Sequence, residues 1–173
     1  MGGYMQMEAK SRGRSIAAFG IGAVLLIILD QITKLAAQKL LRGRDAYVLI
    51  PGVFELQYLE NRGSAFGLMQ GQRVFFLVMA GLMLLLIPYV YYRIPLTRRF
   101  WYLRVTACLF LAGAGGNAVD RLLHGYVVDF FSFSLIHFPI FNVADIYVTV
   151  STFLLIMLML FYYQDEDFEQ IRF

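Results

Sequence analysis

The chain has 173 residues with a net charge of +3, and 60% of the residues are hydrophobic whereas only 16% are charged. Soluble domains usually carry about a quarter charged residues, so this composition excludes an ordinary water-soluble domain and indicates a membrane protein. The small positive excess, without a basic stripe interleaved with aromatic residues, argues against a nucleic-acid partner, and the length fits a single domain over residues 1–173.

The first apolar stretch covers residues 16–37 and is uncharged until Asp30 and Lys34. A helix needs roughly 20 apolar residues to cross the hydrocarbon core. Because basic residues precede this stretch, a cleaved signal peptide is the alternative interpretation. The apolar run continues through Asp30 without a small-residue cleavage site, and further spans follow it, so we expect a retained transmembrane helix.

The segment 38–73 is too long for a bare connection between helices. Its parts 47–50 and 53–59 are rich in strand-forming residues and are separated by Pro51 and Gly52, which are typical of a turn. Apolar and polar residues alternate in the second part, as in a half-buried strand. We therefore predict a small β-sheet on the outer face of the membrane.

Three further apolar stretches follow at residues 74–92, 102–123 and 146–164. The first and last of these carry no charge, whereas the middle one contains Asp120 and Arg121 near its end. Each is long enough to span the membrane if those two side chains face protein or lie at a helix end. The predicted fold is an all-α polytopic membrane protein with four transmembrane helices and a small β-rich element between the first two.

Basic residues in short loops tend to remain on the cytoplasmic side. They gather before the first span and between the second and third: Lys10, Arg12, Arg14, Arg93, Arg98, Arg99 and Arg104. Lys39, Arg42 and Arg44 conflict with this pattern because they fall in the predicted outer loop. The two consistent segments outweigh that conflict and place both termini in the cytoplasm.

Ionisable side chains within spans are costly and are usually functional. Asp30 and Lys34 are four residues apart, so they share a helix face and form either a structural ion pair or a contact with substrate. Asn117, Asp120 and Arg121 share a face of the third span. We expect Asp120 to be structural, either holding Arg121 or bonding backbone groups, while the Arg121 guanidinium is suited either to that role or to clamping a carbonyl or phosphate.

Two aspartates, Asp129 and Asp145, fall at the predicted outer boundary of the membrane. Asp145 follows Asn142 by three residues at the start of the last span, where the helix dipole alone would accommodate it. Asp129 lies in an apolar segment that a merely solvated acid would not need. Two carboxylates in a partly dry site share a proton, so one can activate water while the other donates to a scissile carbonyl. The pattern predicts an aspartic peptidase.

Other chemistries find less support in the sequence. Neither metal-binding motifs nor a phosphate-binding glycine loop are present, so we expect no metal and no cofactor, and a Ser64–His124 couple lacks a third orienting group. The rival functions are a small transporter or proton-relay protein using the same aspartates, and a structural subunit whose charges pair with partner helices. Aspartates at one membrane edge, without an inverted repeat, favour the peptidase.

Five short blocks, in chain order, carry a resemblance to a known family. They are Asp30-Gln31-Ile32-Thr33-Lys34, Asn61-Arg62-Gly63-Ser64-Ala65-Phe66, Gly115-Gly116-Asn117-Ala118-Val119-Asp120-Arg121, Gly125-Tyr126-Val127-Val128-Asp129-Phe130 and Phe141-Asn142-Val143-Ala144-Asp145. On these blocks the chain resembles the lipoprotein signal peptidases, or signal peptidase II, of bacterial inner membranes. Any single block is weak evidence, whereas five in order on a four-span chain are specific.

The resemblance implies a four-helix fold with both termini cytoplasmic and a β-cradle over a site near the extracytoplasmic face. It implies cleavage of diacylglyceryl-modified prolipoproteins just before the lipidated cysteine, with membrane lipids as neighbours and globomycin-type cyclic peptides as inhibitors. Asp129 and Asp145 would be the catalytic pair. Substrate-binding or site-ordering residues would be Asn61, Gly63, Asn117, Arg121 and Asn142, and supporting residues would be Asp30, Lys34 and Asp120. The segment 130–139 is less polar than the resemblance leads us to expect.

Overall fold

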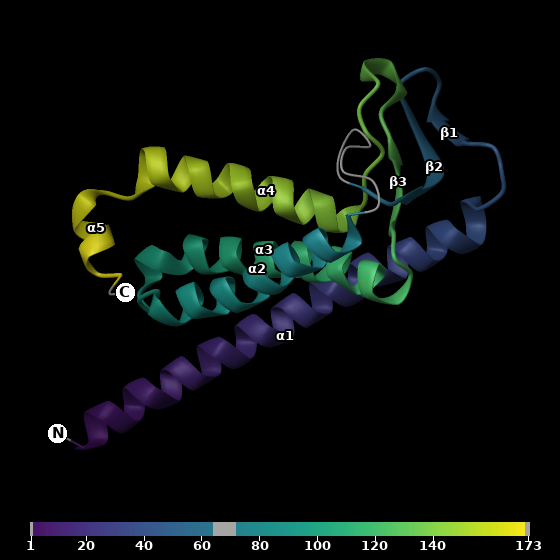
Figure 1. Ribbon diagram of the computed structural model, residues 1–173. Coiled ribbons are helices and arrows are strands. Elements are labelled where there is room, and N and C mark those ends of the chain that lie inside the picture. The colour runs from purple at the N-terminus through teal and green to yellow at the C-terminus, as the bar shows by residue number, and fades with distance from the viewer. Residues whose placement is uncertain (1, 64–71, 172–173) are drawn as a thin grey trace.

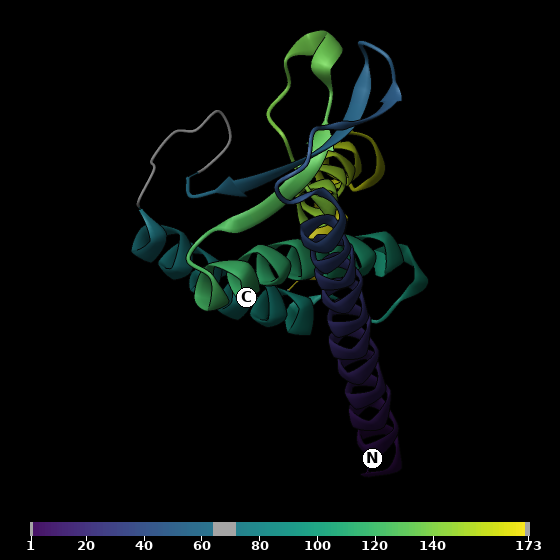
Figure 2. The ribbon, with the colours of Figure 1, turned by 90° about the vertical axis from the view of Figure 1, so that its right-hand side faces the viewer.

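The computed structural model describes residues 2–63 and 72–171 (Figure 1). Its long helices are α1 (Gly2–Leu41), α2 (Arg73–Arg93), α3 (Trp101–Leu123) and α4 (Val143–Met157), and α4 continues as the π-helix η4 (Leu158–Tyr162). α2, α3 and α4 lie side by side, and α1 crosses them obliquely (Figures 1 and 2). The part of the predicted outer loop at residues 64–71 lies outside the described residues.

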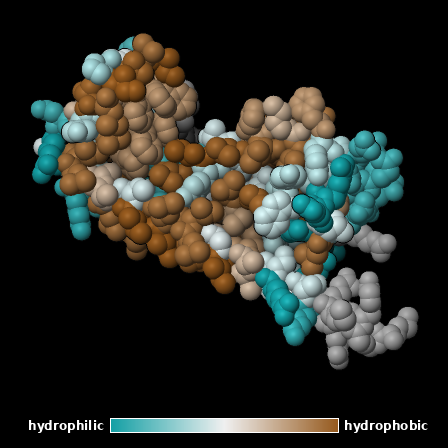
Figure 3. Space-filling view, turned by 180° about the vertical axis from the view of Figure 1, so that it is seen from behind, coloured by the Kyte–Doolittle hydropathy of each residue, from teal (hydrophilic) through white to brown (hydrophobic). Residues whose placement is uncertain are grey.

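Within the described residues, three helices are long and apolar enough to cross a membrane: Lys10–Leu41, Arg73–Arg93 and Val143–Tyr162. Their surfaces carry exposed large apolar side chains such as Leu25, Leu85 and Phe153. Figure 3 shows this apolar surface over the middle of the molecule, with hydrophilic residues towards its two ends. A water-soluble protein would bury such surfaces, so lipid is the solvent that fits them.

α3 is less apolar and occupies the centre, where it packs against α1, α2 and α4. Small residues allow this close approach. A Cβ added at Gly113 would lie 2.6 Å from Val148 Cγ2 on α4, and one added at Gly116 would lie 2.6 Å from Asp30 Oδ2 on α1. The glycines of α3 therefore position the two neighbouring helices that carry polar residues of the site.

A three-stranded antiparallel sheet covers one end of the helices, in the order β1–β2–β3. β1 (Tyr47–Ile50) and β2 (Phe54–Asn61) form the hairpin predicted from the sequence. β3 (Val127–Ser132) was not predicted, because this short apolar segment was interpreted as a connection between spans. Gly125 ends α3 with a positive φ of 80°, as expected for a helix C-terminus, and turns the chain directly into β3.

Successive side chains of β3 point to opposite faces. Val128 and Phe130 are buried against Ala37 and Leu41 at the end of α1. That packing turns the intervening residue, Asp129, to the other face of the strand. The apolar contact with α1 is therefore what directs the carboxylate of Asp129 away from α1.

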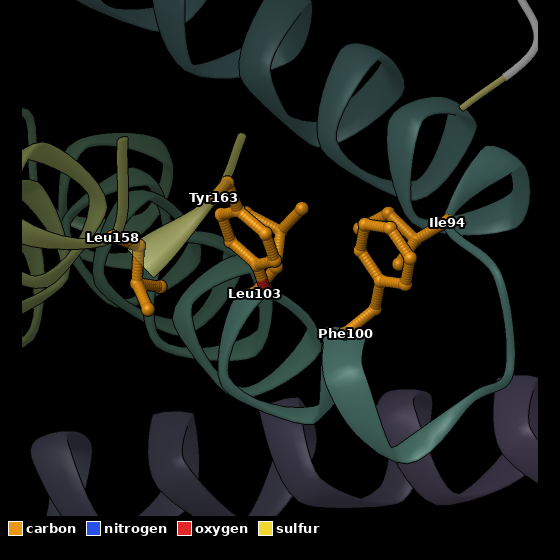
Figure 4. Close-up of a cluster of buried hydrophobic side chains, with 5 residues drawn as sticks. All are labelled: Ile94, Phe100, Leu103, Leu158 and Tyr163. Atoms are coloured by element: carbon orange, nitrogen blue, oxygen red, sulfur yellow. The ribbon is translucent and has the colours of Figure 1, made fainter. Parts of the chain in front are cut away.

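The opposite end of the bundle holds the turn between α2 and α3. This turn contains the 3-10 helix η2 (Arg98–Phe100), and the short helix α5 (Asp165–Glu169) follows α4 beside it. A buried apolar cluster joins these parts, made of Ile94, Phe100, Leu103, Leu158 and Tyr163 (Figure 4). The end remote from the sheet is thus tied together by its own small core.

Candidate active site

A pocket of about 650 Å³ opens where the ends of α3 and α4 meet the sheet. One part of its lining is polar and consists of Asn61, Gly63, Asn117, Arg121, Asp129 and Asp145. The rest is largely apolar and comes from α4 and from the segment that follows β3, including Phe133, Ile136, Phe138, Phe141 and Ile146. Polar groups therefore converge at one end of an otherwise apolar pocket.

The register of the sheet brings Asn61 to Asp129. Asn61 of β2 pairs with Val127, and Leu59 pairs with Asp129, so Asn61 and Asp129 are diagonal neighbours on one face. The Asn61 side-chain amide donates to Asp129 Oδ2 over 2.8 Å. Asp129 is almost fully buried, and this hydrogen bond satisfies one of its two oxygens.

Asp145 is held by the first turn of α4. Asn142 and Asp145 form a capping box, in which the Asp145 backbone N–H donates to Asn142 Oδ1 over 3.0 Å and the Asn142 backbone N–H donates to Asp145 Oδ2 over 3.1 Å. The Asn117 side-chain amide of α3 donates to the other carboxylate oxygen over 2.7 Å. The position expected for a simple helix-capping aspartate is thus also a position on the pocket wall.

Asn142 connects the two aspartates. Its backbone N–H donates to Asp145, and its side-chain amide donates to Asp129 Oδ1 over 2.6 Å. Asn142 is fully buried, and its hydrogen bond to Asp129 lies away from solvent. One residue therefore fixes the position of each carboxylate relative to the other.

Burial raises the pKa of Asp129 from its ordinary value to about 7, and the nearby charge of Asp145 adds to that rise. The hydrogen bonds from Asn61 and Asn142 and the charge of Lys34 oppose it, because they favour the ionised carboxylate. Asp129 can consequently hold a proton near neutral pH, as a shared-proton pair requires.

Lys34 lies behind the pocket and is itself buried. Its ammonium is 2.9 Å from Asp30 Oδ2, the ion pair predicted from the spacing, and 3.2 Å from Asp120 Oδ2. It also donates to Asn117 Oδ1 over 2.9 Å. Because the oxygen of the Asn117 amide faces Lys34, its NH₂ group is directed towards Asp145.

The two carboxylates paired with Lys34 also bind backbone groups of the site. Asp30 Oδ1 accepts from the backbone N–H of Ala144, in the first turn of α4, over 2.8 Å. Asp120 Oδ2 accepts from the backbone N–H of Val128, next to Asp129, over 2.9 Å. The network therefore connects α1 and α3 to the two segments that carry the aspartates.

Arg121 lies at the polar end of the pocket. Its guanidinium donates to the backbone oxygen of Gly63 over 3.2 Å and stacks over the Phe76 ring at 4.6 Å. Of the two roles considered for Asp120, bonding to backbone is observed, whereas no ion pair with Arg121 is present among the described residues. Arg121 thus keeps its charge available at the pocket.

Several contributors were missed from the sequence. Gln31 donates to Asp30 Oδ2, Asp120 Oδ1 and the backbone oxygen of Gly116. Phe76, under Arg121, gave no signal because it is one of many apolar residues in its helix. The apolar wall of the pocket, which includes Phe133, Ile136 and Phe138, was indicated by the low polarity of residues 130–139. Its position beside the aspartates was not predicted.

Residues 22–161 match the protein family described as signal peptidase (SPase) II. The chain belongs to the signal peptidase II family. The lipoprotein signal peptidase of Caldanaerobacter subterraneus subsp. tengcongensis is 39% identical over 137 residues, covering 79% of this chain and 91% of that protein. The lipoprotein signal peptidase of Clostridium tetani is 39% identical over 140 residues, covering 79% of this chain and 88% of that protein.

The fold is also similar to that of solved membrane enzymes. A bacterial membrane enzyme determined by the in meso method at 2.3 Å resolution is 30% identical, with a TM-score of 0.73 over 83% of this chain and 88% of its own. A second bacterial membrane enzyme, at 1.9 Å resolution, is 30% identical with a TM-score of 0.71, covering 85% of this chain and 95% of its own. As a signal peptidase II, the protein is an aspartic peptidase of lipoprotein processing, and its apolar helices are those of a membrane enzyme.

In this signal peptidase II, the predicted site residues gather at one end of the bundle. Six of the seven residues predicted for catalysis or substrate binding line the pocket, and the seventh, Asn142, is buried behind it. Asp30, Lys34 and Asp120, predicted as supports, form the network behind that end. No cluster of three His, Cys, Asp or Glu side chains suited to a metal ion occurs among the described residues.

Proposed function

We propose that this signal peptidase II cleaves diacylglyceryl-modified prolipoproteins just before the lipidated cysteine, with Asp129 and Asp145 as a catalytic pair. Removal of signal peptides from prolipoproteins is the activity that the family supports. The observation that carries the catalytic assignment is the Asn142 bridge, which holds both carboxylates at the polar end of one pocket.

Burial raises the pKa of both aspartates, that of Asp129 to about 7. In the proposed mechanism the pair shares one proton, which we assign to Asp129, and Asp145 is the ionised partner. Asp145 removes a proton from a water molecule, whose oxygen attacks the scissile carbonyl carbon. Asp129 donates its proton to the carbonyl oxygen, which gives a tetrahedral diol. As the diol collapses, Asp145 gives its proton to the leaving nitrogen, Asp129 takes a proton from a diol hydroxyl, and the C–N bond breaks. The products are an amine and a carboxylic acid, and the pair returns to its starting state.

The remaining polar residues are assigned to substrate or to site order. The free charge of Arg121 and the backbone of Gly63 face the pocket, where they can position the peptide near the aspartates. Asn61, Asn117 and Asn142 orient the carboxylates through their amides. The lipid group of the substrate would lie along the apolar wall, and a globomycin-type cyclic peptide would occupy the same pocket.

We further propose that α3 is a fourth membrane-spanning helix. It has 23 residues and is enclosed by α1, α2 and α4, so it can be less apolar than helices that face lipid. The basic residues in the first part of α1 and those around the turn between α2 and α3 favour cytoplasmic termini. In a bacterial inner membrane the pocket would then lie near the extracytoplasmic face.

The substrate assignment is tested with purified enzyme and one prolipoprotein prepared with and without its diacylglyceryl group. We expect cleavage of the lipidated form alone, with mass spectrometry placing the cut directly before the modified cysteine, and no effect of EDTA. Equal cleavage of both forms would contradict the lipid dependence. Neither the pocket nor the comparisons support the alternative of a transporter or proton relay.

A further inference from the structure

A second cavity lies at the end of the bundle remote from the sheet. Its volume is about 890 Å³, and it is bounded by the turn between α2 and α3 and by the end of η4. Besides Leu96, its lining consists of three arginines and three aromatic residues: Arg98, Arg99, Arg104, Trp101, Tyr102 and Tyr162. No acidic side chain is among the described residues of this lining, so the cavity carries an excess of positive charge.

The framework of this cavity is well packed. It lies beside the buried cluster of Figure 4, in which the rings of Phe100 and Tyr163 stack at 5.4 Å. Arg99 stacks on Tyr162 at 4.4 Å and forms an ion pair with Asp167 of α5 at 2.7 Å. Asp167 therefore neutralises Arg99 and fixes it as part of the wall.

The other two arginines keep their charge. Arg104 donates to the backbone oxygens of Pro95 and Thr97 over 2.6 and 3.3 Å, which holds its guanidinium in place. Arg98 is exposed. Neither arginine forms an ion pair with a carboxylate in the part of the chain that the structure describes. Two unpaired guanidinium groups at one cavity suit a bidentate anion such as a phosphate.

The aromatic residues indicate which kind of phosphate fits. Trp101 and Tyr102 are more than half exposed and occupy the first turn of α3, at the proposed cytoplasmic boundary of the membrane. Tryptophan and tyrosine prefer that depth, and basic pockets between helices on that side suit anionic lipid headgroups. A soluble phosphate would gain nothing from the exposed rings, whereas a lipid would cover them.

We propose that this cavity binds an anionic phospholipid, with Arg98 and Arg104 holding its phosphodiester and Trp101, Tyr102 and Tyr162 packing against its glycerol backbone. The inference rests on the proposed position of this end at a membrane boundary, but not on the catalytic roles of Asp129 and Asp145. The bound lipid would anchor the end of the enzyme remote from the catalytic pocket.

Trp101 is the single tryptophan of the chain, so its fluorescence reports on this cavity alone. The enzyme is reconstituted in phosphatidylcholine vesicles that contain equal fractions of either brominated phosphatidylglycerol or brominated phosphatidylcholine, because bromine quenches tryptophan on contact. We expect stronger quenching by the anionic lipid. Arg98→Gln should reduce that preference by about fivefold, the effect of one arginine beside an anionic surface.

Arg44→Gln is the matched control, since it removes one exposed arginine near the sheet, at the other end of the molecule. It should leave the preference unchanged. Equal quenching by the two lipids, or a preference that survives Arg98→Gln, would overturn the proposal. Loss of the preference in 10 mM inorganic phosphate would assign the cavity to soluble anions instead.

Prolipoprotein cleavage measured in the same vesicles separates this proposal from the proposed function. Normal cleavage without a lipid preference would remove the lipid site and leave the catalytic assignment intact. A lipid preference in an enzyme whose cleavage does not depend on Asp129 and Asp145 would support the lipid site and contradict the catalytic assignment.

Discussion

At the scale of single residues, the site depends on amide groups that hold two carboxylates together. Asn142 donates to both, while Asn61 and Asn117 each donate to one. Each of these amides favours ionisation of its carboxylate, whereas burial of Asp129 favours the protonated form. The protonation state of the pair is therefore set by a balance that single substitutions can shift in a known direction.

The pH dependence of cleavage follows from that balance. In the proposed mechanism Asp129 must be protonated to donate, and its pKa is about 7, so kcat/KM should fall as the pH rises above about 7. Asn61→Ala removes a hydrogen bond that lowers this pKa. The pH at which kcat/KM begins to fall should therefore rise by about one pH unit. The pH dependence of kcat/KM is measured for wild type and Asn61→Ala on a lipidated prolipoprotein. If activity falls at the same or a lower pH in Asn61→Ala, the assignment of Asp129 as proton donor is contradicted.

At the scale of the elements, buried charges and glycines decide how α1 and α4 meet α3. The Asp30–Lys34 pair is local and was predicted from a spacing of four residues. Its continuation to Asp120 and to the backbone of Ala144 joins segments far apart in the sequence, and no local pattern signals such contacts. For the same reason the β1–β2 hairpin was predicted from its turn, whereas β3 was missed, because its partner β2 lies more than 60 residues earlier.

Asp30→Ala tests whether this network supports the fold more than the reaction. The substitution leaves Lys34 with one fewer counter-charge and the Ala144 N–H without its acceptor, which should cost about 3 to 5 kcal/mol of folding free energy. The yield of folded protein should therefore fall more than the turnover per folded molecule. Asp30→Asn keeps an acceptor for the Ala144 N–H, so it should retain more folded protein than Asp30→Ala. If Asp30→Ala instead lowers turnover more than the yield of folded protein, Asp30 acts in the reaction itself.

Gly113→Ala tests the close contact between α3 and α4. The added Cβ would lie 2.7 Å from the backbone oxygen of Ala144, which cannot move aside as a flexible side chain can. We expect a destabilisation of about 1–3 kcal/mol, seen as a lower midpoint of thermal unfolding in detergent. Gly81→Ala is the control on α2, because its Cβ meets nothing within 4 Å; an equal loss in both variants would argue against the contact.

At the scale of the whole molecule, the two ends of the bundle differ in chemistry. One end carries the sheet and the pocket lined by the two aspartates, and the other carries α5 and the cavity lined by arginines and aromatic residues. Figure 1 shows the sheet and α5 at opposite ends of the helices. The sequence predicted the apolar stretches and the asymmetry of basic residues, because both can be read directly from the order of residues along the chain. It did not predict that α1 would continue as a helix from Gly2 through the basic segment, since charge patterns mark membrane boundaries and not helix ends.

Membrane orientation is testable with single cysteines. After Cys108→Ala removes the only native thiol, Asp45→Cys places one thiol beside the sheet and Glu166→Cys places one in α5; both positions are exposed. A membrane-impermeant maleimide added to spheroplasts should label the first and spare the second until the cells are lysed. Labelling of Glu166→Cys in intact spheroplasts would reverse the proposed orientation.

The most direct test of the catalytic pair is cleavage of a lipidated prolipoprotein by wild type, Asp129→Asn and Asp145→Asn, each normalised to folded protein. Each substitution keeps the size of the side chain but removes its ability to exchange a proton. Since acid–base groups contribute about a hundredfold or more to rate, both variants should lose at least that factor while remaining folded. Cleavage at the wild-type rate by either variant would show that the two aspartates do not act as a catalytic pair.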